Sequence, residues 1–284
     1  MVKQGPSFFW GSRRRWLYAL LSAITALFLC LGSPKPSYGI PWIELLLRGV
    51  QVLQLSSLSD NQEIKLGKAI NQQLVQEDQI RLSNNAQLNR YLNQIGRRLA
   101  QNSDRPDIPY KFQVVEDKSI NAFATMGGYV YINTGLMAAA DNEAELASVL
   151  AHEIGHIAAR HALKQMRQQA LAQGVLSTAG LDQSTAVQLG VQLALNLPNS
   201  RQDELEADRL GLATLQRAGY APAAMVSFME KLLKQGGSVP TFLSTHPAPS
   251  DRIVALQQAI DPQRAYLGDG LDNLAYKRKI QSLL

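Results

Sequence analysis

The chain has 284 residues, of which 46% are hydrophobic and 18% are charged, and its formal net charge is +5. This balance is typical of a globular protein and excludes a disordered or coiled-coil chain. Five basic residues and no acidic ones precede residue 40, and the remainder of the chain carries 23 basic and 23 acidic residues. Because the net charge belongs to this first segment, it predicts no nucleic-acid partner.

Residues 1–39 have the pattern of an export signal. A basic cluster at residues 13–15 precedes an apolar run from Trp16 to Leu31, and small residues follow at Ser37-Tyr38-Gly39. A cleaved signal peptide is the favoured interpretation, and an uncleaved membrane anchor is the alternative, although the run is shorter than the ~20 residues of a membrane span. Either one predicts an exported protein of the periplasm or cell envelope, with membrane association as an option.

The single cysteine, Cys30, lies within this segment. A mature chain over 40–284 would then have no thiol, so disulfides and thiolate chemistry are excluded, and a metal site must use His, Asp or Glu. We expect residues 40–284 to form one domain with its core at about 59–260.

Hydrophobic periodicity predicts an α+β fold that is mostly α, with a small antiparallel sheet beside one long helix. The predicted elements in chain order are helices from residues 59 and 84, strands over 110–116, 121–124 and 129–133, a long helix over 141–174, and helices over 200–217, 222–235 and from 250.

The strongest chemical signal is His152-Glu153-Ile154-Gly155-His156 inside the long predicted helix. Residues four apart lie about 40° apart around a helix and one turn along it, so both imidazoles face one point. Two neutral imidazoles can hold a divalent metal. Glu153 lies about 100° from His152, which suits a general base acting on metal-bound water. Unrelated helices also carry this spacing, so a third ligand is needed.

Two places offer that third ligand. His161 lies nine residues after His152, about 180° around a continuous helix, which favours a packing or surface role. Glu204 and Asp208 share a helix face in the acidic stretch 200–208, which suits a ligand carboxylate and a neighbour that orients a ligand histidine. A capped, solvated first turn of a helix explains the same stretch equally well, and the residues alone leave both interpretations open.

Several separated motifs resemble metallopeptidase family 48, and together they cover residues 59–260. They are Glu145–His156, Ser200–Asp208, Gln62-Glu63-Ile64, Asn121–Ala124, and Thr245-His246-Pro247 with Arg252. The resemblance implies a zincin-like (gluzincin) domain with one Zn²⁺ held by His152, His156 and Glu204. It also implies that Asp208 lies beside a ligand, and that His246 and Arg252 come over the metal from a C-terminal loop.

His246 and Arg252 can both donate to an oxyanion at the scissile carbonyl, so we count them among the catalytic residues. The alternative is a rigid turn at Pro247 and Pro249, followed by a surface helix that carries Arg252. A second hypothesis for His246, taken from relatives within the family, is that it caps the zinc and keeps the enzyme latent.

Gly127, Gly128 and Tyr129 predict an edge strand with which an extended substrate can pair, although an ordinary hairpin fits almost as well. Main-chain pairing reads few side chains, which predicts broad specificity for unfolded segments. We therefore predict a zinc-dependent endopeptidase acting on misfolded or unfolded envelope proteins. The alternative is a zinc-bearing chaperone or adaptor that binds such chains without cleaving them. Because the ligand histidines must be neutral, activity is expected to fall below about pH 6.

Overall fold

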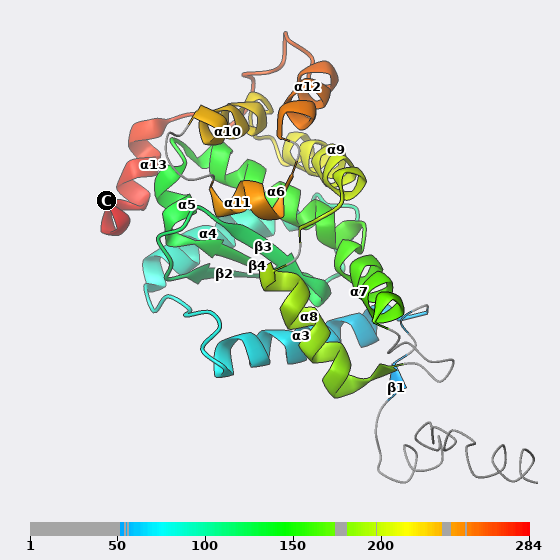
Figure 1. The fold of residues 1–284 in the computed structure, drawn as a ribbon. Coiled ribbons are helices and arrows are strands. Elements are labelled where there is room, and N and C mark those ends of the chain that lie inside the picture. Colours follow the sequence, from blue (N-terminus) through cyan, green and yellow to red (C-terminus); the bar gives the residue numbers. More distant parts are fainter. Residues whose placement is uncertain are drawn as a thin grey trace, which may run out of the picture. The chain divides into compact units, whose positions relative to one another are not determined.

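A small sheet of three strands lies between two layers of helices in the computed structural model (Figure 1). The strands β2 (Lys111–Val115), β3 (Ala122–Thr125) and β4 (Tyr129–Asn133) are arranged in the order β2-β4-β3. β4 pairs in parallel with β2 and antiparallel with β3. The mostly helical α+β class and the three strand positions confirm the prediction. The sheet is mixed and not antiparallel, because β4 runs in the direction of β2 and inserts between its two predecessors.

The structure describes residues 52–53, 55, 57–173, 181–196, 198–234, 240–247 and 249–284, all within one unit, Val50–Leu284. The predicted leader, its cleavage site and Cys30 lie outside the described residues. The other elements are β1 (Val52–Leu53), α3 (Asp60–Gln76), α4 (Ala86–Ala100), η1 (Met126–Gly128), α5 (Thr134–Ala139), α6 (Glu143–Ala158), α7 (His161–Ala172), β5 (Leu181–Asp182), α8 (Gln183–Asn196), α9 (Arg201–Arg217), α10 (Ala223–Lys234), α11 (Thr241–Thr245), α12 (Pro249–Ala259), α13 (Asn273–Lys279) and η2 (Gln281–Leu283).

β4 is buried along its whole length because both faces of the sheet are covered. Val130 and Ile132 belong to a core built with α4, α6 and the C-terminal helices, whereas Tyr129 and Tyr131 belong to a second core built with α3, α7 and α8. Successive side chains of a strand point to opposite faces, so this division follows directly from the strand period. The first of these cores fixes α6 against one face of the sheet.

The long helix predicted over 141–174 is two helices. α6 ends at Ala158, Arg160 takes the left-handed conformation with φ 58° and ψ 35°, and α7 begins at His161. The prediction missed this break because neither a glycine nor a proline marks it. The chain therefore changes direction four residues after His156.

Within the described ranges, the structure contains no helix with the length and apolar character needed to cross a bilayer.

Candidate metal centre

The helix α6 is rigidly placed before it reaches the histidines. The side chain of Asn142 caps its first turn by accepting the N–H of Glu145 at 3.0 Å, and every residue from Ala144 to Ile157 is buried. His152 and His156 project from one face of this helix, and they are only 2% and 6% exposed. A helix buried on all sides cannot shift easily, so the two imidazoles are held in fixed positions.

The helix α9 packs closely against α6 and supplies the acidic residues. Ser200 caps its first turn by accepting the N–H of Asp203 at 3.2 Å. Glycines allow the close approach, because a Cβ at Gly155 would lie 2.5 Å from the carbonyl oxygen of Ala207. Glu204 and Asp208 consequently face the α6 histidines across this interface, completely buried.

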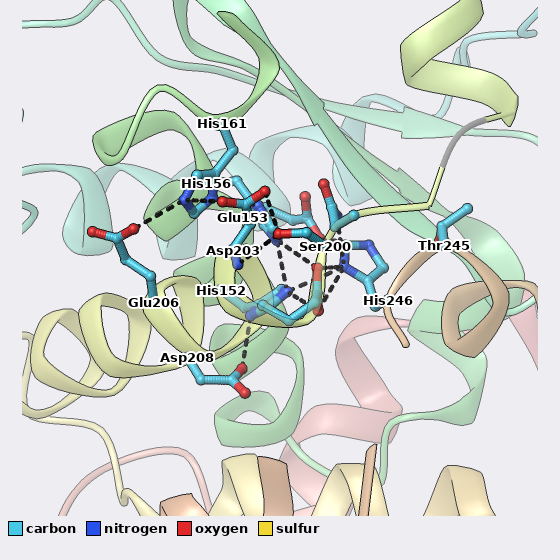
Figure 2. A network of polar contacts seen from close by, with 12 residues as sticks. His152, Glu153, His156, His161, Ser200, Asp203, Glu206, Asp208, Thr245 and His246 are labelled. Atoms are coloured by element: carbon cyan, nitrogen blue, oxygen red, sulfur yellow. Dashed lines mark hydrogen bonds and ion pairs between the residues drawn. The ribbon is translucent and has the colours of Figure 1, made fainter. Parts of the chain in front are cut away.

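Four side chains converge on one point (Figure 2). The Nε2 atoms of His152 and His156 are 3.0 Å apart. They lie 3.4 and 3.2 Å from the two carboxylate oxygens of Glu204. The Nδ1 of His246 lies 3.2 Å from the Nε2 of His152 and 3.0 Å from Glu204.

These distances fit a divalent metal. Zinc–nitrogen and zinc–oxygen bonds of about 2.0–2.2 Å place tetrahedral ligand atoms about 3.3–3.6 Å apart, which is within about 0.3 Å of the separations between these donors. The donor set, two imidazoles and a carboxylate with a third imidazole, is also the chemistry that zinc prefers. The residues present therefore fit the metal that the sequence predicted.

A ring of charged partners holds the ligand candidates from behind. Asp208 lies 2.9 Å from the Nδ1 of His152, which orients that imidazole with its Nε2 toward the centre. Arg252, 1% exposed, donates to Asp208 through its Nε and Nη2 at 2.6 and 2.7 Å and contacts Glu204 through its Nη1 at 2.5 Å. Its donors are therefore engaged by two carboxylates, in a buried position that does not match a surface helix.

Burial and neighbouring charges compete over the pKa values of these groups. Burial lowers the pKa of His156 to about 3, although a hydrogen bond to the carboxylate of Glu204 acts in the opposite direction. Burial also disfavours the charged form of His152, but the carboxylates of Glu204 and Asp208 outweigh it and raise the pKa of His152 to about 9. Burial would raise the pKa of Glu204, yet the imidazoles of His246 and His152 hold it far below its usual range. Glu204 thus remains an anion, as a cation site requires.

Glu153 differs from the other carboxylates of the site. It is 1% exposed, and its Oε1 has no hydrogen-bond partner among the described residues. The nearest donor on the loop is the Nε2 of His246, at 3.5 Å. Burial raises the pKa of this carboxyl, so Glu153 holds a proton more readily than an exposed glutamate does.

His246 directly follows α11, and its ring is turned toward the cluster (Figure 2). The ring of His246 stacks on the ring of Phe242 with centroids 4.3 Å apart, and the backbone N–H of His246 donates to the backbone carbonyl of Phe242 at 2.8 Å. Asn199 also contacts its Nδ1, at 3.4 Å. His246 therefore occupies the fourth corner of the ligand cluster.

His161 lies against the site, beside His156, and not on the opposite side where a continuous helix would place it. Its Nδ1 is 2.9 Å from the Nδ1 of His156, because the helix is interrupted at Arg160 and α7 starts in a new direction. His161 is buried, so of its two predicted roles the packing role is partly correct and the surface role is wrong. No local sequence signal predicts the helix break at Arg160 that brings His161 next to His156.

The expected substrate strand is wrong in one respect. Tyr129 begins β4, which is paired on both sides, so Gly127, Gly128 and Tyr129 do not lead into an edge strand. The two glycines lie in η1 with φ of 75° and 93°; Gly127 packs against α3, and Gly128 packs against residues 108–110. The edge strand next to α6 is β3, whose only pairing within the described part of the chain is with β4.

A cavity of about 60 Å³ opens beside the cluster. Glu153, His156 and His246 line the part next to the cluster, and apolar side chains from β3, η1 and α8 line another part, among them Phe123, Met126 and Leu193. Further polar side chains, among them Glu63, Arg160 and His161, also line this cavity. A polar centre with an apolar cavity next to it is the usual form of a site that binds part of a substrate side chain.

The fold and the site together define a zincin-like metallopeptidase domain. The sequence model described as peptidase family M48 matches residues 86–260. The chain belongs to this family.

Curated relatives agree with this assignment. The chain is 34% identical to the beta-barrel assembly-enhancing protease of Escherichia coli (strain K12) over 74% of this chain and 46% of that protein. It is 32% identical to the metalloprotease LoiP of the same organism over 73% of this chain and 84% of LoiP. It is 37% identical to the mitochondrial metalloendopeptidase OMA1 of Arabidopsis thaliana over 54% of this chain and 32% of that protein. The chain thus spans about half the length of the assembly-enhancing proteases that it matches.

Proposed function

We propose that this protein is a zinc-dependent endopeptidase that cleaves misfolded or unfolded proteins of the cell envelope. The observation that carries the proposal is the convergence of His152, His156 and Glu204. Beside them lies a carboxylate oxygen of Glu153 with no hydrogen-bond partner in the described part of the chain. Membership of a peptidase family agrees with it. The export-signal pattern of the first 39 residues and the name of the assembly-enhancing protease support the envelope location.

Each residue of the site has a place in peptide hydrolysis. Zinc held by His152, His156 and Glu204 would act as a Lewis acid and lower the pKa of a water to about 7. Glu153 would take the proton of the attacking water and pass it to the leaving amine. Its raised pKa suits this shuttle, because the carboxyl can hold the proton between the two steps.

The substrate would lie along β3. An extended peptide pairs with the free edge of a sheet through main-chain hydrogen bonds, which specify little sequence. β3 offers such an edge next to α6, and one substrate side chain would enter the partly apolar cavity beside Glu153. β3 therefore replaces Gly127–Tyr129 as the proposed pairing strand.

His246 and Arg252 retain separate proposed roles. With its Nδ1 at the fourth corner, His246 would cap the metal and must move before a water can take that position. After moving, it can donate to the oxyanion. Arg252 holds Asp208 and Glu204 in place, and its donation to an oxyanion would require release of one of those contacts.

Zinc content and casein cleavage test the proposal when both are measured on the purified full chain. The variants are Glu153→Gln, His246→Ala and, as a charge-matched control at an exposed position, Glu77→Gln. We expect one zinc per chain in every case, cleavage by the wild type or by His246→Ala, and a rate at least about 10²-fold lower for Glu153→Gln. If the wild type and all variants bind zinc and none of them cleaves casein, the result would support the chaperone or adaptor alternative. A chain that binds no zinc would refute the proposal.

A further inference from the structure

The turn between α6 and α7 is strained and lies directly beside the metal centre. Arg160 is in the left-handed region, and Asp78 is the only other residue with a side chain and positive φ in the part of the chain that the structure describes. This conformation is unfavourable for residues with a Cβ, and it persists where surrounding contacts impose it. The contacts of Arg160 therefore matter.

A buried glutamate of α3 holds this turn. The Nε of Arg160 donates to the Oε2 of Glu63 at 2.9 Å, and its Nη2 donates to the Leu58 carbonyl at 2.7 Å. Glu63 is 1% exposed and also accepts from Arg105 at 3.0 and 3.3 Å. Charge-assisted hydrogen bonds to a buried carboxylate are stronger than neutral ones. The turn is thus fixed by a segment about 100 residues away in the sequence.

The turn brings His161 to the outer nitrogen of His156. In a continuous helix two residues five apart would point about 140° away from each other. Here their Nδ1 atoms are 2.9 Å apart and their rings meet edge to face, with centroids 5.0 Å apart (Figure 2). The inner nitrogen of His156, Nε2, faces His152 and Glu204.

Together with a metal on His156, these contacts would fix the tautomers of both rings. A metal on the Nε2 of His156 requires its proton on Nδ1, so His156 donates and the Nδ1 of His161 accepts. The proton of His161 is then on Nε2, which lies 3.3 Å from Glu206 and 3.5 Å from Asp203. Both carboxylates belong to α9, as Glu204 does. These contacts therefore connect α6 to α9 through His161, in addition to the connection made by the ligand residues themselves.

His161, Asp203 and Glu206 are close enough to suggest a second metal site. Their other contacts favour a different role. Asp203 already pairs with Lys164 at 2.5 Å and accepts from the hydroxyl of Ser200 at 2.7 Å. The remaining nitrogen of His161 is turned to His156. This cluster therefore has its cation, Lys164, and its histidine serves the neighbouring site.

We infer that His161 is a positioning residue of the metal centre: its Nδ1 accepts the Nδ1–H of His156 and fixes that imidazole for metal binding, as Asp208 does for His152. This inference rests on the proposed function. Partners of metal-bound histidines commonly contribute about 10–100-fold to metal affinity. The strained turn at Arg160 is the device that makes the contact.

Zinc affinity, measured by competition with a chromogenic chelator on the full chain, tests the inference. His161→Leu removes the acceptor at similar size, whereas the Oδ1 of His161→Asn can accept near the position of Nδ1. Met166→Ala is the control, because Met166 is fully buried on the same helix α7 and has no part in the site. We expect a 10–100-fold loss of affinity for His161→Leu and recovery to within a few-fold for His161→Asn. Met166→Ala should lower the urea midpoint with little change in affinity.

Three results would overturn the inference: wild-type affinity in His161→Leu, equal losses in His161→Leu and His161→Asn, or an equal loss in Met166→Ala. Each of them leaves the peptidase proposal standing if the wild type binds zinc and cleaves casein. A wild type that binds no zinc would remove the proposed function and this inference together.

Discussion

Gly155→Ala should damage the metal centre without touching a ligand. The added Cβ would lie 2.5 Å from the carbonyl oxygen of Ala207 and 3.1 Å from its Cα. Ordinary contact begins at 3.4 Å, so α9 must retreat by about 0.9 Å, because close-packed backbone has no other way to yield. Glu204 lies one turn before Ala207 on that helix and must move with it.

The expected magnitude follows from two opposing effects. Alanine favours a helix over glycine by about 1 kcal/mol, whereas overpacking costs about 1–3 kcal/mol, so the free energy of unfolding should fall by no more than about 2 kcal/mol. The site suffers more, because metal–ligand distances tolerate only about 0.2 Å. We expect a loss of zinc affinity and a cleavage rate about 10²-fold lower.

The assay combines zinc affinity from chelator competition, casein cleavage and urea unfolding. Gly96→Ala in α4 is the matched control, because its Cβ would lie 2.4 Å from the ring of Phe112 in β2, in a contact that includes no part of the metal centre. It should destabilise the fold and leave zinc affinity unchanged. If Gly155→Ala binds zinc and cleaves as the wild type does, the spacing of α6 and α9 does not set the site, and the reasoning fails.

Three further outcomes are expected. Glu204 and Asp208 outweigh burial and raise the pKa of His152 to about 9, so zinc must displace a proton from this imidazole at pH 7. Calorimetry should therefore show that the zinc affinity rises by up to about tenfold per pH unit toward pH 9. A zinc affinity that does not change with pH would contradict this. Replacing His246 by alanine should raise casein cleavage if the cap dominates or lower it if oxyanion donation dominates, and an unchanged rate excludes both roles. Arg252→Ala removes the guanidinium that contacts two buried carboxylates and should lower the free energy of unfolding by about 3–5 kcal/mol; urea denaturation showing less than about 1 kcal/mol would mean that the guanidinium does not hold them.

The parts of the fold set by local periodicity could be predicted from the sequence. The strand positions follow from alternation, and the shared face of His152 and His156 follows from helical spacing. Whether Glu204 approaches them could not be decided from its own stretch, because a solvated first turn carries the same residues. The resemblance to a family, drawn from several distant motifs, was needed to choose between the two interpretations.

Contacts between distant segments escaped prediction. β4 is the central strand because it pairs with both β2 and β3. The residue pattern of Tyr129–Asn133 indicates a strand but does not predict which strands pair with it. The break at Arg160 depends on Glu63, far away in the sequence. Because of this break, His161 lies beside His156 and not on the opposite side, where a continuous helix would place it.

The most direct test of the metal centre is X-ray absorption spectroscopy on the zinc-loaded chain. We predict one zinc per chain with nitrogen and oxygen ligands at about 2.0–2.2 Å and the multiple-scattering signal of at least two imidazoles. That signal should weaken in His156→Ala. Zinc bound through water and carboxylate oxygens alone, or an imidazole signal unaffected by His156→Ala, would contradict the convergence of these residues on one ion.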